Sequence, residues 1–403
     1  MPYYRVHIYP TSPIHRGIAS SAGKSSAIIH SDTLHAALLC VSTLIDKNEY
    51  WLKQRALNLK ISSAYPFFKD REDKIIYLYP RPFPIYKPVS NSKEKDPTED
   101  KKKWKRVKYL SESALSEYLK RPDKFTSLPL SSLEFTDEPS IDPKENFGKF
   151  PTCCLKDEVE ILANRPRVIV KDELLTSIVT DRGGNYETTS KDKSRYGTTP
   201  FQRSYIRVNT DEGAGLWFIV ELSDEELPEF NKLLRILGIL GIGGERTIGY
   251  GHFEFNGDTD IQPFSSQHIT IENISDYSLL CFKDLYNPEQ KPNSILSLSL
   301  YHPTKEEFHS QLFGGYASYE CAIRSGWICE IAGTTKPRMS VRMCLEGSSF
   351  PIHIDGNPNN YLIPRGDVVD TREYEHHTPH PVWRSGLLLG ISFYNQHIKY
   401  GDN

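Results

Sequence analysis

The sequence lacks the signatures of a metal-stapled, disulfide-bonded or membrane-embedded protein. Its seven cysteines contain no C-x-x-C spacing, because Cys153 and Cys154 are adjacent and the others are scattered. That pattern argues against a zinc site or a disulfide framework and favours buried free thiols. No apolar run approaches the roughly 18 residues of a membrane span, and the segment Met1–Pro10 lacks the apolar core of a signal peptide. We therefore expect a cytoplasmic protein with no membrane partner.

A strong charge of either sign is also missing. The 403 residues carry a net charge of −3 and give a pI near 6.5. A protein that binds nucleic acid by bulk electrostatics is far more basic. If this chain binds RNA, its cations must therefore gather on one face, which leaves the remaining surface for protein partners. A hydrophobic content of 38% with 11% aromatic residues indicates a folded chain, long enough for two domains.

Familiar catalytic motifs are absent as well. The chain has no H-E-x-x-H, no G-x-S-x-G and no pair of acidic motifs suited to magnesium, so we expect no catalytic residue, no metal and no cofactor. His15, His30 and His35 could serve an acid–base cleavage of RNA, since imidazole titrates near neutral pH. His30 and His35 also flank a helix start, where packing or capping explains them as well. The histidine-rich segment His376–His380 lacks a completing ligand set, and its prolines favour a structural role.

The segment Gly17–Ser25 resembles a phosphate-binding Walker A loop at first sight. That motif places four residues between its two glycines, whereas five separate Gly17 from Gly23. A register error of one residue misplaces the cradle of main-chain amides, so the spacing argues against ATP hydrolysis. We expect Lys24 and His15 to line an RNA-binding face instead.

The order of elements predicts an α+β protein. Residues 3–9 alternate like a half-buried strand, and Leu34, Leu38 and Val41 share one helical face after Ser31, which we read as an N-cap. Ser223–Glu226 fits a capping box for a helix that continues to Leu240, followed by a glycine-rich loop and a strand at 252–255. This order suits a β-α-β-β-α-β ferredoxin-like domain over residues 1–260, with insertions near 66–150 and 181–207.

A second, strand-rich domain is expected over residues 267–403. Its strands are predicted near 268 and at 277–282, 295–301, 319–331, 339–344 and 387–393. In the first insertion, three prolines in Tyr77–Pro84 favour extended backbone over a central strand. Between 181 and 207 the chain is polar and carries glycine and many cations, among them Arg195 and Arg203.

Six cations surround one tryptophan and one valine in the segment Lys101–Lys108. Such a run is commonly a solvated loop. Interleaved aromatic residues instead suit an element that closes over a single nucleic-acid strand. We favour nucleic-acid binding, with these candidate contacts: Lys103, Trp104, Lys105, Arg106 and Lys108.

The segment Gly241–Gly251 holds five glycines in eleven residues. Glycine permits positive φ and removes side chains, so a phosphate can approach main-chain N–H groups. Arg246 supplies a forked cation, Thr247 a hydroxyl and Tyr250 a face for stacking a base. A structural helix-to-strand turn is the alternative. The arginine and the tyrosine favour RNA, with these candidate contacts: Gly243, Gly244, Arg246, Thr247, Gly249, Tyr250 and Gly251.

Several motifs, taken in order, resemble one family. They are His30–Leu38, Ser62–Phe67, Tyr79–Pro82, Gly243–Gly251, Lys336–Met339, Glu346–Ser349 and His380–Arg384. Each is weak alone, but their order is similar to that of the fourth subunit of Csm complexes, RAMP-superfamily proteins of type III-A CRISPR interference. The motifs reach from residue 30 to residue 384 and so span most of the chain.

The resemblance implies two ferredoxin-like (RRM-like) domains with a glycine-rich loop. It implies binding of the 5′ handle of the CRISPR RNA and docking onto the large polymerase–cyclase subunit and the neighbouring backbone RAMP subunit, with target RNA met only indirectly. No nuclease or cyclase site is implied. Carried onto this chain, the handle contacts would include the glycine loop, the face around Ser31 and Lys24, and Lys336 and Arg338.

Two other functions remain open. One is a metal-independent endoribonuclease of the same superfamily that processes CRISPR RNA with His15 or His35 as its acid–base group. The other is the equivalent subunit of a Cmr-type complex. The chain also departs from a compact family member in its long insertions, which could contact RNA or another subunit.

Overall fold

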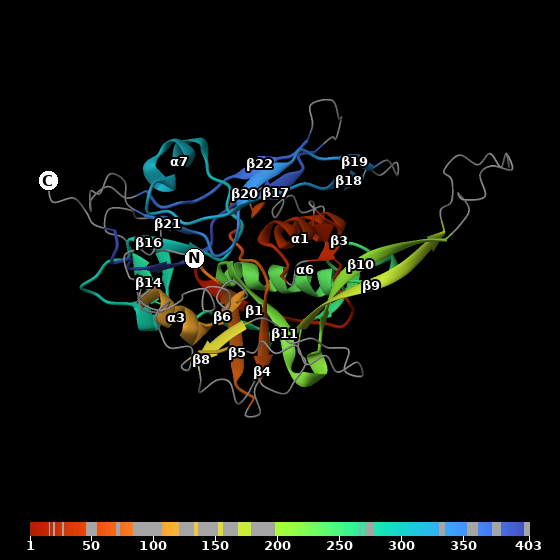
Figure 1. Cartoon of the computed structure of the whole chain (residues 1–403), viewed down its shortest axis with the longest axis horizontal. Coiled ribbons are helices and arrows are strands. Elements are labelled where there is room, and N and C mark those ends of the chain that lie inside the picture. Colours follow the sequence, from red (N-terminus) through yellow and green to blue (C-terminus); the bar gives the residue numbers. More distant parts are fainter. Residues whose placement is uncertain are drawn as a thin grey trace, which may run out of the picture.

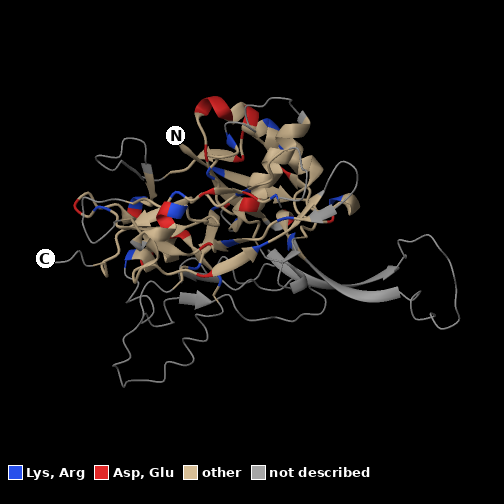
Figure 2. Cartoon of the chain, turned by 90° about the horizontal axis from the view of Figure 1, so that it is seen from above, with Lys and Arg blue, Asp and Glu red and all other residues tan. Residues whose placement is uncertain are grey.

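The computed structural model describes residues 1–15, 17–18, 21–25, 28–45, 55–69, 73–83, 107–120, 133–135, 152–155, 168–178, 198–265, 267–270, 278–329, 335–352, 362–372 and 380–398. The chain is a mixed α/β protein whose sheets are mainly antiparallel (Figure 1). Basic and acidic residues are interspersed along the described parts of the chain (Figure 2).

A nine-stranded sheet forms from the N-terminal part of the chain. Its order is β12-β1-β11-β4-β5-β6-β8-β7, with β13 also paired to β1. The strands are β1 (Tyr3–Pro10), β4 (Tyr65–Lys69), β5 (Ile75–Pro80), β6 (Tyr109–Ser111), β7 (Leu133–Phe135), β8 (Thr152–Leu155), β11 (Ala214–Glu221), β12 (Phe253–Glu254) and β13 (Ile261–Pro263). The predicted strands at 3–9 and 252–255 are confirmed in this sheet.

Two long helices lie side by side on one face of that sheet (Figure 1). Helix α1 (Ser31–Ile45) buries Leu34, Leu38 and Val41 on the predicted face. Helix α6 (Leu227–Leu240) follows the 3₁₀ turn η4 (Asp224–Glu226). The predicted capping box is confirmed there, since the main-chain N–H of Ser223 donates to Glu226 Oε2 over 2.8 Å. A third helix, α3 (Glu112–Lys120), covers the sheet near β5 and β6.

The prediction that the proline-rich stretch avoids a central strand is wrong. β5 lies between β4 and β6 in the sheet. Its register with β6 runs from Leu78 opposite Ser111 to Pro80 opposite Tyr109, so the first proline stands at the end of the strand, and the next follows it. The residues before it keep the N–H groups that pairing requires.

The polar region assigned to residues 181–207 is also partly a strand. β9 (Val168–Ile178) and β10 (Thr198–Val208) pair along their full eleven residues and form a ribbon that projects from the sheet (Figure 1). Threonine, phenylalanine, tyrosine, isoleucine and valine in Thr198–Val208 favour a strand. The cations between these β-formers hid that pattern.

The C-terminal part forms a five-stranded sheet in the order β14-β15-β24-β16-β21. Its strands are β14 (Gln267–Thr270), β15 (Ser278–Cys281), β16 (Ser294–Ser297), β21 (Ser349–Pro351) and β24 (Gly390–Phe393). Three antiparallel pairs flank it: β17 (Cys321–Arg324) with β20 (Val341–Cys344), β18 (Trp327–Cys329) with β19 (Thr335–Pro337), and β22 (Val368–Asp370) with β23 (Trp383–Ser385). A short helix, α7 (Lys305–His309), also belongs to this part.

The largest hydrophobic cluster spans both parts, and two smaller clusters lie within the C-terminal part. Leu296 of β16 and Ile391 of β24 belong to the same buried cluster as Trp217 of β11. Helix α1 lies between α6 and the C-terminal strands, where it contacts β23 (Figure 1). The start of α1 is therefore a junction between the two parts of the chain.

No helix among the described residues is long and apolar enough to cross a membrane.

Candidate nucleic-acid interface

The glycine-rich loop after α6 is tied to the segment that follows β1. The N–H of Gly251 donates to Pro13 O over 2.8 Å, and the N–H of Gly244 donates to His15 O over 2.9 Å. The N–H of Ile242 donates to Gly251 O over 2.9 Å and closes the loop on itself. Main-chain carbonyls thus accept the hydrogen bonds of the Gly244 and Gly251 amides, so these two N–H groups are not free donors for a phosphate.

Most of the glycines are required by the protein's own packing. Gly243 and Gly251 have φ values of +94° and +85°. A Cβ at Gly243 would lie 2.5 Å from His15 O, and one at Gly251 would lie 2.1 Å from Ile242 O. Gly249 also has a positive φ, +89°, but a Cβ there would meet nothing within 4 Å. The structural-turn interpretation thus accounts for Gly243 and Gly251.

The tip of the loop presents side chains to solvent. Arg246, Thr247 and Ile248 form the 3₁₀ turn η5 (Arg246–Ile248), and all three are exposed. Tyr250 is half-buried, with its ring edge-on to Tyr205 of β10 at 6.1 Å between centroids. Contacts from this loop to a ligand would therefore come from side chains, with Arg246 as the cation.

A second group of cations gathers around Asp32 in the first turn of α1. Arg324 of β17 donates from Nη2 to Asp32 Oδ1 over 2.7 Å and from Nε to Oδ2 over 3.0 Å. Arg384 of β23 donates to the same Oδ2. Burial raises the pKa of Asp32, but the two arginines outweigh that effect and hold the pKa well below its usual range. Asp32 is therefore a buried carboxylate shared by two arginines.

A third arginine adds to the positive charge of this cluster. Desolvation lowers the pKa of Arg338, Asp32 raises it and Arg324 lowers it, which places Arg338 within electrostatic reach of both. Its Nε is buried and has no hydrogen-bond partner among the described residues. Burial, opposed by Asp32 and reinforced by Arg338 and Arg324, lowers the pKa of Arg384 to about 10. We call Asp32, Arg324, Arg338 and Arg384 the arginine cluster.

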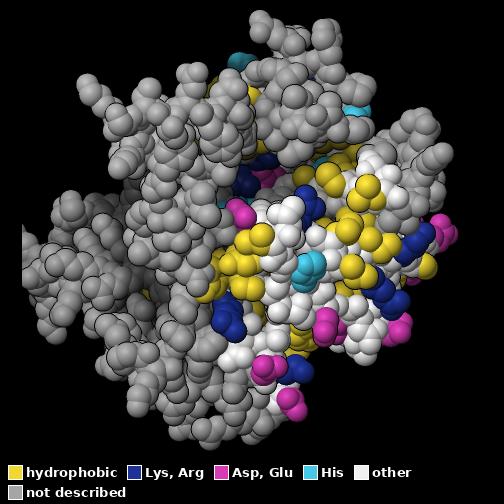
Figure 3. Space-filling view, turned by 90° about the vertical axis from the view of Figure 1, so that its right-hand side faces the viewer, with side chains coloured by type: hydrophobic (Ala, Val, Ile, Leu, Met, Phe, Trp, Pro, Cys, Tyr) yellow, Lys and Arg dark blue, Asp and Glu magenta, His cyan; other side chains and the backbone are white. Residues whose placement is uncertain are grey.

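The arginine cluster and the glycine loop approach the same part of α1. Desolvation raises the pKa of the Cys40 thiol, whereas Arg246 and Arg338 both lower it. Two predicted RNA contacts, from opposite parts of the chain, thus lie within electrostatic reach of one residue of α1. Figure 3 views the molecule from the right-hand side of Figure 1, and cationic and acidic side chains both lie on the described surface there.

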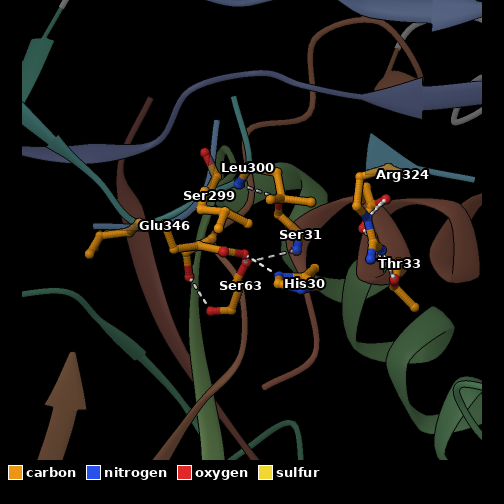
Figure 4. Close-up of polar contacts among 12 residues, drawn as sticks. His30, Ser31, Thr33, Ser63, Ser299, Leu300, Arg324 and Glu346 are labelled. Atoms are coloured by element: carbon orange, nitrogen blue, oxygen red, sulfur yellow. Dashed lines mark hydrogen bonds and ion pairs between the residues drawn. The ribbon is translucent and has the colours of Figure 1, made fainter. Parts of the chain in front are cut away.

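Ser31 is buried and so does not lie on the predicted interface. It is 3% exposed, its hydroxyl accepts the N–H of Leu300 over 3.0 Å, and its own N–H donates to Ser63 Oγ over 2.9 Å (Figure 4). Ser63 Oγ also donates to Glu346, which pairs with His30 Nδ1 at 2.5 Å. These serines join the start of α1 to the C-terminal part. The prediction that Ser31 is the N-cap is wrong, because Ser31 is the first residue of the helix and the N–H groups of Thr33 and Leu34 donate to His30 O.

The predicted histidines divide into buried and accessible ones. His35 has no exposed surface, and its Nε2 lies 2.9 Å from Ala56 O, while His30 is paired with Glu346. Neither ring can reach an RNA. His15 is half-buried and lies beside Gly244, where its main-chain carbonyl holds the glycine loop.

Because His35 is buried in its neutral form, the free energy of unfolding depends on pH. Burial lowers the pKa of His35 to about 4 from 6.5, so between these values the unfolded chain binds a proton that the folded chain does not. The contribution of neutral His35 to the free energy of unfolding is therefore fully present above pH 6.5 and is lost as the pH falls towards 4. We expect His35→Gln to remove on the order of 2 kcal/mol of the loss between pH 7 and 5.

Urea unfolding at the two pH values measures this effect. His380 is exposed, so His380→Gln serves as the matched control and should keep the parent's pH dependence. A His35→Gln protein with the parent's pH dependence would show that His35 is not the group responsible.

Of the remaining predicted contacts, Lys108 lies away from this place, and the others are placed only by their strands or lie outside the described residues. Lys108 is exposed at the start of β6, four strands from β1 in the sheet order, or roughly 19 Å at the usual strand spacing. Val107 and Tyr109 beside it are core residues. Lys24 in β3 (Ser21–Ser25), Arg203 in β10 and Lys336 in β19 are described only as strand residues, and β3 pairs with β2 (Gly17–Ile18). Outside the described residues lie Lys103, Trp104, Lys105, Arg106 and Arg195.

No group of three metal-binding side chains occurs in the described part of the chain. His380 is exposed, with Nδ1 3.1 Å from Pro381 O, and the rest of the histidine-rich segment, 376–379, lies outside the described residues.

Comparisons with known proteins give two family matches. The model for the RAMP superfamily matches residues 53–254, half of the chain. The model for the CRISPR Csm4 C-terminal domain matches residues 290–393. The two matches cover most of the sheet-forming residues on either side of the junction.

Curated relatives and solved structures agree with these matches. The CRISPR system Cms protein Csm4 of Mycobacterium tuberculosis, in strains CDC 1551/Oshkosh and ATCC 25618/H37Rv, is 29% identical over 143 residues, which are 36% of this chain and 37% of the relative. The matched region thus spans little more than a third of these relatives. The crystal structure of the Csm3–Csm4 subcomplex of the type III-A interference complex contains a chain with the same fold, at a TM-score of 0.55 and 16% identity over 98% of this chain and 100% of that one.

Proposed function

The chain belongs to the RAMP superfamily and carries the Csm4 C-terminal domain, and we propose that it is a non-catalytic RNA-binding subunit of a type III-A CRISPR effector complex. In this role it binds the 5′ handle of the CRISPR RNA at the junction between its two parts. The handle contacts come from the arginine cluster and from the tip of the glycine loop.

The observation that carries the proposal is the excess of positive charge at the junction. Three arginines surround one carboxylate, and the buried Nε of Arg338 has no hydrogen-bond partner among the described residues. Buried charges are normally paired. An RNA phosphate would supply the missing anion, because guanidinium groups bind phosphate oxygens through two parallel hydrogen bonds.

Arg246 extends this positive site to the surface. It is exposed on η5 and shares the neighbourhood of Cys40 with Arg338. Tyr250 and Thr247 beside it offer a ring and a hydroxyl to a nucleotide. A strand of RNA passing over α1 would meet both the loop and the cluster, with its phosphates towards the arginines.

The strand order supports a ferredoxin-like domain at the N-terminal end. The order β12-β1-β11-β4, with α1 after β1 and α6 after β11, is that of a β-α-β-β-α-β unit. For residues 267–403 the ferredoxin-like assignment stays a prediction, and so does the division of the chain near residue 260.

Docking onto other subunits is the second part of the proposed role. The similar solved chain comes from a Csm3–Csm4 subcomplex, which supports a neighbouring backbone RAMP subunit as a partner. Aromatic side chains lie exposed on the C-terminal part, including Phe308, Tyr316 and Tyr319. Such residues are enriched at protein interfaces. The large polymerase–cyclase subunit and, through it, the target RNA complete the proposed assembly.

Binding should depend on both cationic elements. We expect Arg338→Ala and Arg246→Ala each to weaken binding of a handle RNA by roughly 1–3 kcal/mol, because each removes one charge-assisted phosphate contact. Fluorescence anisotropy at physiological salt measures the affinity. Lys283→Ala, at an exposed position on the turn η6 (Lys283–Leu285), is the matched control and should bind like the parent.

If all three variants bound the handle RNA with the parent's affinity, that result would contradict the proposed site. A loss in Lys283→Ala equal to that in Arg338→Ala would show that only net charge matters.

The competing function, an endoribonuclease, now depends on His15, since His35 is buried. Incubation of the purified protein with repeat RNA in a chelator separates the two functions. We expect the RNA to stay intact. Clean cleavage that is lost in His15→Ala would establish the nuclease instead.

A further inference from the structure

Two cysteines face each other across a pair of antiparallel strands in the C-terminal part. Cys321 of β17 stands opposite Cys344 of β20, and their sulfur atoms are 3.8 Å apart. Cys321 is exposed and Cys344 is buried. The proposed RNA-binding role uses neither thiol.

The main-chain hydrogen bonds show which kind of strand pair this is. The N–H and C=O of Cys344 bond to Tyr301, at 2.8 Å and 3.0 Å, on the side away from β17. The ladder bond between the two strands forms one position further along, from the N–H of Leu345 to Glu320 O. Cys321 and Cys344 are therefore a non-hydrogen-bonded pair, the arrangement that brings opposite Cα atoms to about 4.5 Å. This separation lies within the range that a disulfide spans.

We propose that Cys321 and Cys344 are a redox-sensitive thiol pair that closes to a disulfide when the protein meets a low-molecular-weight disulfide. Cys321, as the exposed residue, reacts first. Its thiolate attacks one sulfur of the small disulfide. That sulfur bonds to Cys321 Sγ and forms the mixed disulfide, and the other sulfur leaves as a thiolate. Cys344 then loses its proton to solvent and attacks Cys321 Sγ, releasing the second small thiolate. Two protein thiols are oxidised and one small disulfide is reduced to two thiols.

The surroundings of Cys344 support this order of events. Burial raises the pKa of the Cys344 thiol, and Cys321 raises it further through its charge and its hydrogen bond. Modification of Cys321 removes the second contribution, so Cys344 loses its proton more readily once its neighbour carries the mixed disulfide. Among the cysteines whose side chains are described, the remaining two, Cys40 and Cys281, have no such partner thiol.

The bond would close the loop from residue 321 to residue 344. Arg324 lies three residues beyond Cys321 on β17, and Arg338 lies between the two cysteines. Oxidation would thus fix the segment that carries two members of the arginine cluster. The reaction of the two thiols does not depend on RNA binding.

Mass spectrometry of the reduced protein treated with oxidised glutathione tests the proposal. We expect an intramolecular disulfide between the peptides of Cys321 and Cys344, and a thermal midpoint about 4 °C higher than that of the reduced protein. Cys321→Ser, at the exposed position, should abolish both. Cys40→Ser removes another exposed thiol and should change neither.

Two outcomes would overturn the proposal. Glutathione retained on Cys321 without release would show that Cys344 does not resolve the mixed disulfide. Pairing of Cys321 with any cysteine other than Cys344 would show that the observed juxtaposition does not determine the chemistry.

Discussion

Asp32→Asn is expected to lower the free energy of unfolding by about 3–5 kcal/mol, the usual cost of breaking a buried ion pair from one side. The side chain of Asp32 is 2% exposed and that of Arg384 1%, so solvent cannot replace the lost carboxylate. Asparagine can accept a hydrogen bond from one arginine, but it leaves the charges of Arg324, Arg338 and Arg384 uncompensated. Urea unfolding followed by tryptophan fluorescence measures the change.

Asp284→Asn is the matched control, because Asp284 is exposed on η6. Its free energy of unfolding should stay within about 0.5 kcal/mol of the parent's. A similar small change in Asp32→Asn would mean that the arginines do not depend on this carboxylate. The junction would then lack the charge organisation that the proposed RNA site requires.

Gly251→Ala is expected to disrupt the glycine loop and to destabilise the protein by at least about 3 kcal/mol. The residue has φ +85°, which by itself costs an alanine about 1–2 kcal/mol. The new Cβ would also lie 2.1 Å from Ile242 O and 2.6 Å from Ile242 N. Both of these atoms belong to the main chain, so a side-chain rotation cannot relieve the clash.

Gly249→Ala separates the two causes. Its φ is +89°, but nothing lies within 4 Å of the new Cβ, so only the cost of about 1–2 kcal/mol for positive φ applies. Thermal unfolding of both variants gives the comparison. Equal losses would show that the packing of Gly251 against Ile242 has no part in the loop's stability.

Local patterns in the sequence predicted local structure well. Alternation predicted β1, the spacing of Leu34, Leu38 and Val41 predicted α1, and Ser223 with Glu226 predicted the turn η4 that leads into α6. Each of these signals depends on residues within a few positions of each other. The strand order that joins β1 to β11 depends on distant residues, and only the succession of elements indicated it.

The arginine cluster could not be predicted, because its members are far apart in the sequence. Arg324 and Arg384 follow Asp32 by 292 and 352 residues. Only the tertiary fold brings β17 and β23 to the start of α1. Of these arginines, only Arg338 was predicted as an RNA contact, because it lies in the motif Lys336–Met339, which resembles the Csm family. Asp32 and Arg384 lie within two other motifs of that resemblance, and the ion pair between them brings these two motifs into contact in the fold.

Ser31, by contrast, was predicted as an RNA contact from the sequence but is buried in the structure. A serine before an apolar helical face predicts an exposed N-cap, and the sequence holds no sign that another part of the chain covers it. In the structure Ser31 is hydrogen-bonded to Leu300 and to Ser63. The polar serines and His30 at this point serve the contact between the two parts of the chain.

Photo-crosslinking of a handle RNA that carries 4-thiouridine, followed by mass spectrometry, tests the central claim most directly. We predict crosslinks in the peptides that contain residues 243–251 and 335–342, and their loss when Arg246 and Arg338 are both replaced by alanine. Crosslinks confined to other surfaces, such as the exposed aromatic residues around Phe308, would contradict an RNA site at the junction of the glycine loop and the arginine cluster.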